Sequence, residues 1–130
     1  WEITKIFPQT IDKINILEAV KIGIKRLIEK ISRKKEKGKI DFVILDGQIE
    51  IDIAVPYKAV IKADEKILSC ALASIVAKVK RDKMMVNYHQ KFQQFCFDKN
   101  KGYGTKIHFL ELRKIGPSPI HRQSFLKRLN

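Results

Sequence analysis

Apolar residues recur at three- and four-residue steps in two long stretches of the chain, which is the pattern of amphipathic helices. These stretches predict one helix from about residue 11 to 35 and another from about residue 66 to 92. Their apolar stripes consist of Ile14, Leu17, Val20, Ile24, Leu27, Ile28 and Ile31 in the first helix, and of Leu68, Ala71, Leu72, Ile75, Val76 and Val79 in the second. Thr105 is placed to cap a third helix that runs to Lys114 and is closed by Gly116 and Pro117.

Shorter apolar segments between these helices predict strands. Residues 1–7 alternate as a half-buried strand does, and residues 42–45 form a continuous apolar run, typical of a strand buried on both faces. Residues 57–61 predict another strand, whereas residues 51–55 fit either a weak strand or an extended loop. Strands and helices mixed in this way predict an α/β fold, and the absence of repeats or long linkers predicts a single domain over residues 1–130.

The charge of the chain adds a partner class to this picture. Lys and Arg number 27 against 14 Asp and Glu, giving a net charge of +13. Such a field attracts polyanions, nucleic acid first and anionic membrane second, although a lysine-rich proteome would also explain the excess. No apolar run approaches the roughly 20 residues of a membrane helix, so a membrane partner is not expected. Cys70 and Cys96 lack metal-site spacing, which favours reduced thiols and a cytoplasmic protein.

Two of the predicted strands are followed by an aspartate, Asp46 after the first and Asp64 after the second. Ligands of open α/β sheets lie beyond the carboxyl ends of the strands, so neighbouring strands would deliver both carboxylates to one place. Oxygen ligands select hard ions such as Mg²⁺ or Mn²⁺, and such an ion in a basic protein suggests phosphodiester chemistry. The alternative is structural, because Asp-Gly is a common turn pair and Asp64 could cap a helix.

A series of short motifs favours the metal site. In chain order they are Asp12-x-x-Asn15-Ile16-Leu17, Leu45-Asp46-Gly47, Lys62-Ala63-Asp64, Ala73-Ser74-Ile75-Val76-Ala77-Lys78-Val79-x-Arg81-Asp82, Lys101-Gly102-Tyr103-Gly104-Thr105-x-x-His108, and Gly116-Pro117-Ser118-Pro119-Ile120-His121-Arg122-x-Ser124-Phe125. This order and spacing resemble bacterial ribonuclease HII, the type 2 ribonuclease H, from Trp1 to the C-terminus. No single motif is specific, but the series in register is.

The resemblance implies an RNase H-like fold, a mixed sheet flanked by helices, here N-terminally incomplete and with a C-terminal helical segment. It also implies an endoribonuclease that cleaves the RNA strand of RNA–DNA hybrids, and duplex DNA 5′ of embedded ribonucleotides, with Mn²⁺ or Mg²⁺. Asp46 and Asp64 match the third and fourth of the family's four metal-binding acids. Nothing in the chain matches the Asp-Glu-Ala-Gly-Arg-Gly segment that supplies the first two, so the 130 residues alone are expected to be inactive.

Residues expected to contact the substrate lie near or beyond these acids. Tyr103 matches the family's tyrosine at the RNA–DNA junction, where a ring packed on the sugar can sense the 2′-hydroxyl. Lys62, Lys78 and Arg81 could hold phosphates, although solvated surface charges are an equal alternative. A straight helix would put Asp82 about 20–27 Å beyond Asp64, so we expect Asp82 to orient a nearby base instead of binding metal.

The scattered histidines are expected to have structural roles. His108 falls in the first turn of the last predicted helix and His121 in the C-terminal motif, which suits packing better than catalysis. The rival hypothesis for the whole chain is a non-catalytic, basic nucleic-acid-binding protein, which would bind duplexes in a salt-sensitive way without needing a divalent ion. A monomer is expected in either case.

Overall fold

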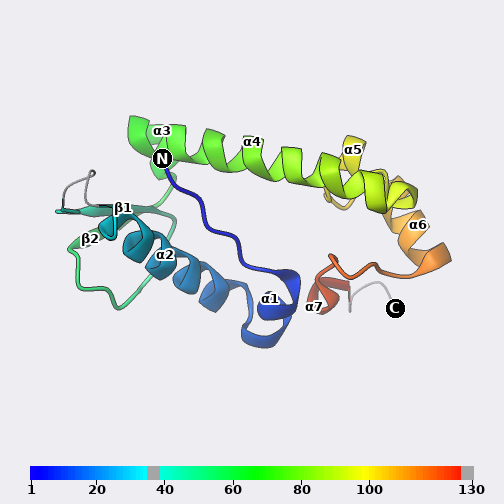
Figure 1. Ribbon diagram of the computed structural model, residues 1–130, viewed down its shortest axis with the longest axis horizontal. Coiled ribbons are helices and arrows are strands. Elements are labelled where there is room, and N and C mark those ends of the chain that lie inside the picture. The colour runs from blue at the N-terminus through cyan, green and yellow to red at the C-terminus, as the bar shows by residue number, and fades with distance from the viewer. Residues whose placement is uncertain (35–38, 127–130) are drawn as a thin grey trace. The chain divides into compact units, whose positions relative to one another are not determined.

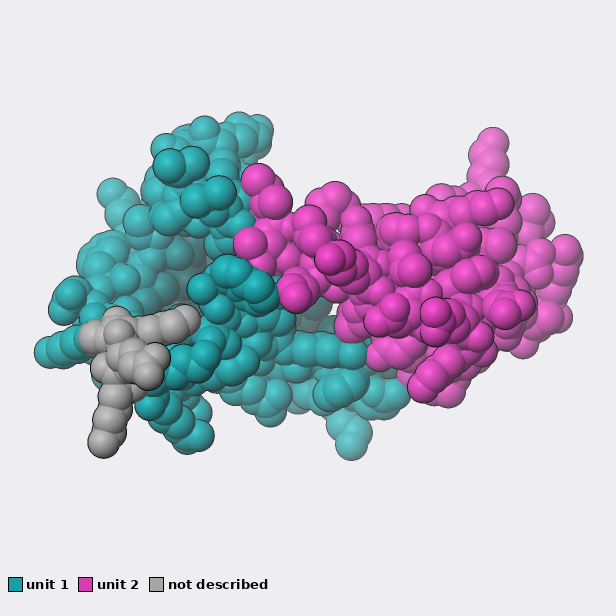
Figure 2. All heavy atoms as spheres, turned by 45° about the horizontal axis from the view of Figure 1, so that its top comes forward, with its two compact units in different colours: residues 1–74 teal, residues 75–130 magenta. Residues whose placement is uncertain are grey.

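The structure, a computed structural model, describes residues 1–34 and 39–126 and has both helices and a parallel sheet (Figure 1). Its elements are α1 (Pro8–Ile14), α2 (Ile16–Ser32), β1 (Val43–Asp46), β2 (Tyr57–Val60), α3 (Ala63–Lys66), α4 (Leu68–Lys91), the 3-10 helix η2 (Gln93–Phe95), α5 (Phe97–Asn100), α6 (Lys106–Ile115) and α7 (Gln123–Leu126). The chain is therefore α/β, as predicted. It divides into two compact units, residues 1–74 and 75–130, with the division inside α4 (Figure 2).

The first seven residues pair with no strand in the described parts of the chain, so the predicted strand is wrong. They lie along α2 instead: the Lys30 ammonium donates to the carbonyl of Ile3 at 3.3 Å, and a Cβ on the buried Gly23 would be only 3.5 Å from Thr4. Hydrogen bonds from Lys30 and Lys34 hold the pKa of the Glu2 carboxyl at about 2. Alternation in this segment reflects packing of one side on a helix instead of strand pairing.

The helix predicted from residue 11 to 35 is two helices, α1 and α2, because the backbone turns at Asn15. Asn15 has φ 68° and ψ 171°, which is outside the helical region and so ends α1, and its side chain accepts from the Glu18 N–H at 3.1 Å to cap α2. The chain enters α1 through Pro8, whose missing N–H costs nothing in a first turn. The predicted end of the helix, at residue 35, lies outside the described residues.

The sheet consists of β1 and β2, which run parallel with Val43 opposite Tyr57 and Asp46 opposite Val60. Both strands agree with the prediction to within one residue. The expected burial on both faces is wrong for β1: Leu45 is buried, but Ile44 is 38% exposed. An apolar run fixes strand character, whereas burial depends on what covers each face.

The segment between the strands is a loop, the second of the two alternatives for residues 51–55. Its anchor is Ile51, which is buried and whose N–H donates to the Tyr57 hydroxyl at 3.2 Å.

The long helix predicted from residue 66 to 92 is present as α4, preceded by the single turn α3. Its expected apolar stripe is not buried among the described residues, since Leu68, Leu72, Ile75 and Val79 are all exposed. Helical spacing predicts that these side chains share a face, and that part holds. It does not identify what covers the face.

The core of residues 75–130 forms where α4 ends and the chain folds back on itself. Its buried members are Met85, Phe95, Phe97 and Leu112. The Phe95 and Phe97 rings stack with centroids 5.5 Å apart. This core holds the segment that carries Tyr103.

Candidate active site

Two carboxylates emerge at the same edge of the sheet. Asp46 ends β1 opposite Val60, the last residue of β2, and Asp64 lies in α3 directly beyond. One oxygen of Asp46, Oδ1, accepts a hydrogen bond of 2.8 Å from the backbone N–H of Ala63, which is fully buried and directly precedes Asp64. The structure thus brings the two predicted acids to one edge, and it fixes the Asp46 carboxylate against the backbone that presents Asp64.

A sharp turn at Lys62 makes this arrangement. Lys62 has φ 56° and ψ 49°, the left-handed region, which costs a residue with a Cβ on the order of 1 kcal/mol. Its ammonium pairs with Glu65 at 2.9 Å, and both side chains are mostly exposed. Such an exposed pair contributes little to stability, so separating Lys62 from Glu65 costs little free energy.

The donor chemistry of the two acids fits a hard divalent ion. Carboxylate oxygens are the ligands that Mg²⁺ and Mn²⁺ prefer, and Asp46 Oδ2 is not used in the bond to Ala63. Within residues 1–34 and 39–126, however, no group of three or more His, Cys, Asp or Glu side chains is placed to hold a metal. These parts of the chain bring two carboxylates, Asp46 and Asp64, to the edge of the sheet, against the four acids that the resemblance implies.

The predicted substrate contacts of the second unit form one cluster. The Tyr103 ring has the Arg81 guanidinium carbon 4.8 Å and the Lys78 nitrogen 5.5 Å from its centroid. Asp82 pairs with Lys78 at 3.4 Å and with Arg81 at 4.0 Å, so it orients these cations, as predicted. Tyr103 is 54% exposed, which leaves its ring accessible between two cations.

Glycines let the Tyr103 loop pack closely on its neighbours. Gly102 has a φ of 75°, and a Cβ there would lie 2.8 Å from the end of the Met85 side chain. A Cβ on Gly104 would lie 2.6 Å from the Phe109 ring. Asn100, which the sequence analysis did not single out, accepts the Gly102 N–H on its side-chain oxygen at 2.8 Å. The glycines have packing partners within the chain whatever they do toward a substrate.

Replacing Gly102 by alanine is expected to destabilise the protein more than the same change at Gly116. Both glycines have a φ of 75°, but a Cβ on Gly116 meets nothing within 4 Å. Gly116→Ala should therefore cost about 1 kcal/mol for backbone conformation alone, and Gly102→Ala up to about 1 kcal/mol more, because the end of the flexible Met85 side chain must shift. Urea unfolding of both variants measures the difference. Equal losses would mean that the Met85 contact yields freely.

Two histidines form a polar pair in the second unit, His108 buried and His121 half-buried. His108 is 4% exposed, and its Nε2 lies 3.3 Å from Nε2 of His121. Burial lowers the pKa of His108, and burial with the neighbouring His108 lowers the pKa of His121 to about 4. Their T-shaped and tilted contacts with Phe95 and Phe97 pack both rings against the core. These contacts support the packing role predicted for both.

Acid should destabilise the protein through this pair before it affects the carboxylates. The unfolded chain binds a proton at His121 near pH 6.5 and the folded chain only near pH 4, so stability is full above 6.5 and falls toward 4. We expect a loss of about 1–2 kcal/mol between pH 7.5 and 5, after allowance for partial exposure. The Glu2 contribution, with a folded pKa of about 2, is retained down to its ordinary value of 4.5. Urea unfolding at both pH values tests this, and His121→Gln should flatten the dependence.

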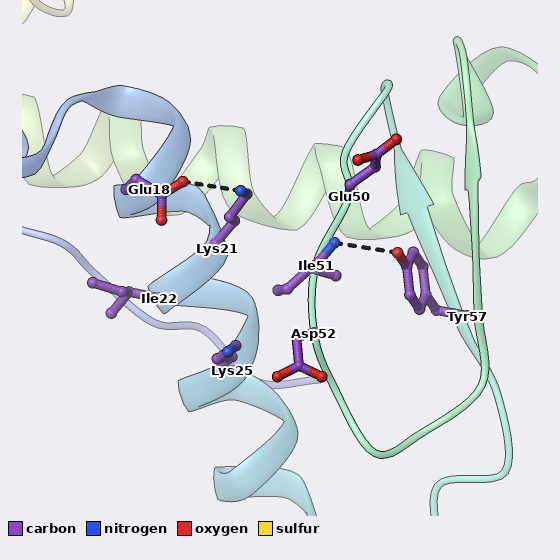
Figure 3. A pocket seen from close by; sticks show the side chains of 8 residues that line it. All are labelled: Glu18, Lys21, Ile22, Lys25, Glu50, Ile51, Asp52 and Tyr57. Carbon is purple, nitrogen blue, oxygen red and sulfur yellow. Dashed lines mark hydrogen bonds and ion pairs between the residues drawn. The ribbon is translucent and has the colours of Figure 1, made fainter.

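A groove in the first unit, drawn in Figure 3, is a separate feature. It is lined by Glu18, Lys21, Ile22, Lys25, Glu50, Ile51, Asp52 and Tyr57. Its three acids outnumber its two lysines, and one of these, Lys21, is paired with Glu18 at 2.9 Å. The groove contains none of the predicted site residues, and its charge does not suit a polyanion.

Comparison with known proteins identifies the family of this chain. The family model described as Ribonuclease HII matches residues 2–128. The chain belongs to the ribonuclease HII family. The ribonuclease HII of Alkaliphilus metalliredigens is 39% identical over 95% of this chain and 61% of its own length. The ribonuclease HII of Alkaliphilus oremlandii is 42% identical over 93% of this chain and 60% of its own length. The ribonuclease HII of Thermotoga maritima is 44% identical over 91% of this chain and 47% of its own length.

The chain thus spans about 60% or less of these ribonuclease HII relatives. Membership agrees with the resemblance read from the motifs and with the α/β architecture.

No helix within residues 1–34 and 39–126 has the length and apolar character needed to cross a bilayer. Cys70 and Cys96 are free thiols.

Sequence reasoning missed Asn100 and Ser118, although each had a signal. Asn100 stands two positions before a glycine, which is typical of an asparagine that bonds its own turn. Ser118 stands three positions before His121, within reach of its ring.

Proposed function

We propose that this chain is the part of a type 2 ribonuclease H that supplies two metal-binding acids and the tyrosine that reads the ribose. The whole protein would cleave the RNA strand of RNA–DNA hybrids and the 5′ side of ribonucleotides embedded in duplex DNA. Residues 1–130 would form one RNase H-like domain with the remaining part of such a protein. On their own, they would not cleave.

One observation carries the proposal: the hydrogen bond from the Ala63 N–H to Asp46 at the strand ends. It orients the carboxylate toward the place from which Asp64 also emerges, without using Asp46 Oδ2. Metal chemistry needs ligands held in a fixed geometry, and a backbone donor on a buried residue holds better than a mobile side chain.

Asp46 and Asp64 would hold Mn²⁺ or Mg²⁺, which supplies charge stabilisation at the phosphate when bound. The remaining steps of the proposal concern binding. Tyr103 would pack on the sugar at the RNA–DNA junction, where only the 2′-hydroxyl separates RNA from DNA. Lys78, Arg81 and Lys62 would hold backbone phosphates, which fixes the register of the duplex without reading its sequence.

The net charge of +13 also favours a second candidate, a basic protein that binds nucleic acid without catalysis. Such a protein would show salt-dependent affinity for duplexes and no requirement for a divalent ion. The two candidates therefore differ in cleavage and in ion dependence, although both predict binding.

The test is cleavage of an end-labelled DNA duplex containing one ribonucleotide, with Mn²⁺ and with EDTA. It uses the 130-residue chain and the longest protein that its reading frame encodes. We expect cleavage 5′ of the ribonucleotide only by a longer protein and only with Mn²⁺. Cleavage by the 130 residues alone would refute the half-site proposal. Binding without cleavage by the longest protein would favour the second candidate.

A further inference from the structure

A continuous chain of hydrogen bonds runs through the core of the second unit from the C-terminal motif. The Ser118 backbone N–H donates to Nδ1 of His121 at 2.9 Å, and the Ser118 hydroxyl lies 2.8 Å from the same nitrogen. Nδ1 of His121 is therefore an acceptor, and the proton of the neutral ring is on Nε2, which faces Nε2 of His108 at 3.3 Å. His108 must then carry its proton on Nδ1, which lies 3.4 Å from the Phe95 carbonyl.

The chain continues from this carbonyl to the loop that bears Tyr103. The Phe95 oxygen also accepts from the Asn100 side-chain amide at 2.6 Å. The oxygen of that amide accepts the Gly102 N–H at 2.8 Å, and the Asn100 carbonyl accepts the Tyr103 N–H at 2.8 Å. One consistent set of proton positions thus links His121 to the backbone on both sides of Lys101.

Polar burial in the described residues is concentrated in this chain. Three polar side chains are buried there, Asn100, His108 and Ser118, and each is a member. A buried polar group that loses its hydrogen-bond partner destabilises the fold, because it is neither paired nor solvated. Such a network therefore favours a single arrangement of the segments that it joins. Packing alone would be served as well by apolar side chains.

Residues 101–103, at which the series of hydrogen bonds ends, need this support. Lys101 has a φ of 50° and Gly102 a φ of 75°, two consecutive residues in the left-handed region. For Lys101, this conformation is unfavourable and persists only when its surroundings hold it. The next residue is Tyr103, whose ring must stay beside Arg81 at 4.8 Å to keep the cluster together.

We propose that His108, His121 and Asn100 are positioning residues for the ribonuclease, which fix residues 101–104 and so hold Tyr103 beside Arg81 and Lys78. The inference rests on the proposed function for Tyr103 as a substrate contact. None of the three needs to touch the substrate.

The test replaces His121 by asparagine, whose side-chain oxygen can still accept from Ser118 while the donor to His108 is lost. Asn100→Asp is the second variant: it keeps the acceptor for Gly102 and replaces the donor to Phe95 by an oxygen. Amide hydrogen exchange of the 130-residue chain is measured by NMR at Gly102 and Tyr103. We expect exchange at both amides to rise about tenfold in each variant, through local opening of the loop.

The control is Leu112→Val, which enlarges the same core without touching a polar member of the chain. Global destabilisation raises exchange at all protected amides together, so it would not single out Gly102 and Tyr103. A second control is the Ala63 amide in the first unit, bonded to Asp46, whose exchange should stay unchanged in the His121 and Asn100 variants.

A second readout is the affinity ratio of the chain for a duplex with one ribonucleotide against an all-DNA duplex. We expect the ratio to fall about three- to tenfold in His121→Asn. For cleavage by a longer protein, we expect the same variant to raise KM by a larger factor than it lowers kcat. If the two amides exchange as in the unchanged chain, the positioning role is refuted. If they respond but the ratio does not, the loop is positioned as proposed and the role of Tyr103 in reading the sugar is refuted.

Discussion

Asp46→Asn is expected to reduce ribonucleotide-specific cleavage by about a thousandfold or more, since a metal ligand contributes several kcal/mol of transition-state stabilisation. The variant keeps a side-chain oxygen for the Ala63 N–H, so the geometry of the strand ends should survive. Only the charge and the ligand strength are removed. The measurement is the single-turnover cleavage rate of the longest protein encoded with this chain, as a function of Mn²⁺ concentration.

Two further variants separate catalysis from folding. Asp46→Ala also removes the bond to Ala63 and should lower the urea midpoint, whereas Asp46→Asn should not. Glu65 is the acid next to Asp64 in the sequence, and it pairs with Lys62. Glu65→Gln should leave cleavage nearly unchanged. Duplex binding by Asp46→Asn should be equal or tighter, since a negative charge is removed near the phosphates. Normal cleavage by Asp46→Asn would remove Asp46 from the metal site.

The sequence predicted the elements best where local pattern decides them. The continuous run before Asp46 and the strand from Tyr57 are both present, and Thr105 caps α6 by accepting the His108 N–H. Strand-end acids could be anticipated because parallel strands end at one edge of a sheet. The resemblance then identified which acids and which tyrosine to examine.

Long-range partners could not be read in the same way. Alternation in residues 1–7 is equally satisfied by a strand or by a segment packed on a helix, and periodicity does not report that α2 begins anew after Asn15. Leu68 and Leu72 are exposed because no described segment covers their side of α4, and residue spacing alone does not predict which segment would cover it.

The hydrogen-bonded chain from His121 to Gly102 was unpredictable for a related reason. Its six members are separate in the sequence and meet through backbone groups as well as side chains: Phe95, Asn100, Gly102, His108, Ser118 and His121. Each residue alone is unremarkable: an asparagine in a turn, a histidine in a first helical turn, a serine between prolines. Only their joint geometry fixes the tautomers and reveals a single network.

Tyr103→Ala is expected to lower the preference for a ribonucleotide-containing duplex over all-DNA by about ten- to a hundredfold. This factor corresponds to about 1.4–2.8 kcal/mol of the affinity difference between the two duplexes, which the proposal assigns to ring packing on the sugar at the 2′-hydroxyl. Because Tyr103 is 54% exposed, its removal should lower the free energy of unfolding only by the loss of exposed cation–π contacts, about 0.5–1 kcal/mol each. Urea unfolding measures this loss. Affinity for both duplexes is measured at fixed salt, and the cleavage rate is measured in the longer protein.

Tyr103→Phe and Arg81→Gln distinguish the ring from its neighbours. If ring packing on the sugar reads the ribose, phenylalanine should retain most of the preference, within about threefold, because the stacked surface is kept. Arg81→Gln should weaken binding to both duplexes alike and reduce the salt dependence by about one counterion, since phosphate contacts carry no ribose information. An unchanged ribonucleotide preference in Tyr103→Ala would mean that Tyr103 only packs beside Arg81, and that the ribose is sensed elsewhere in the protein.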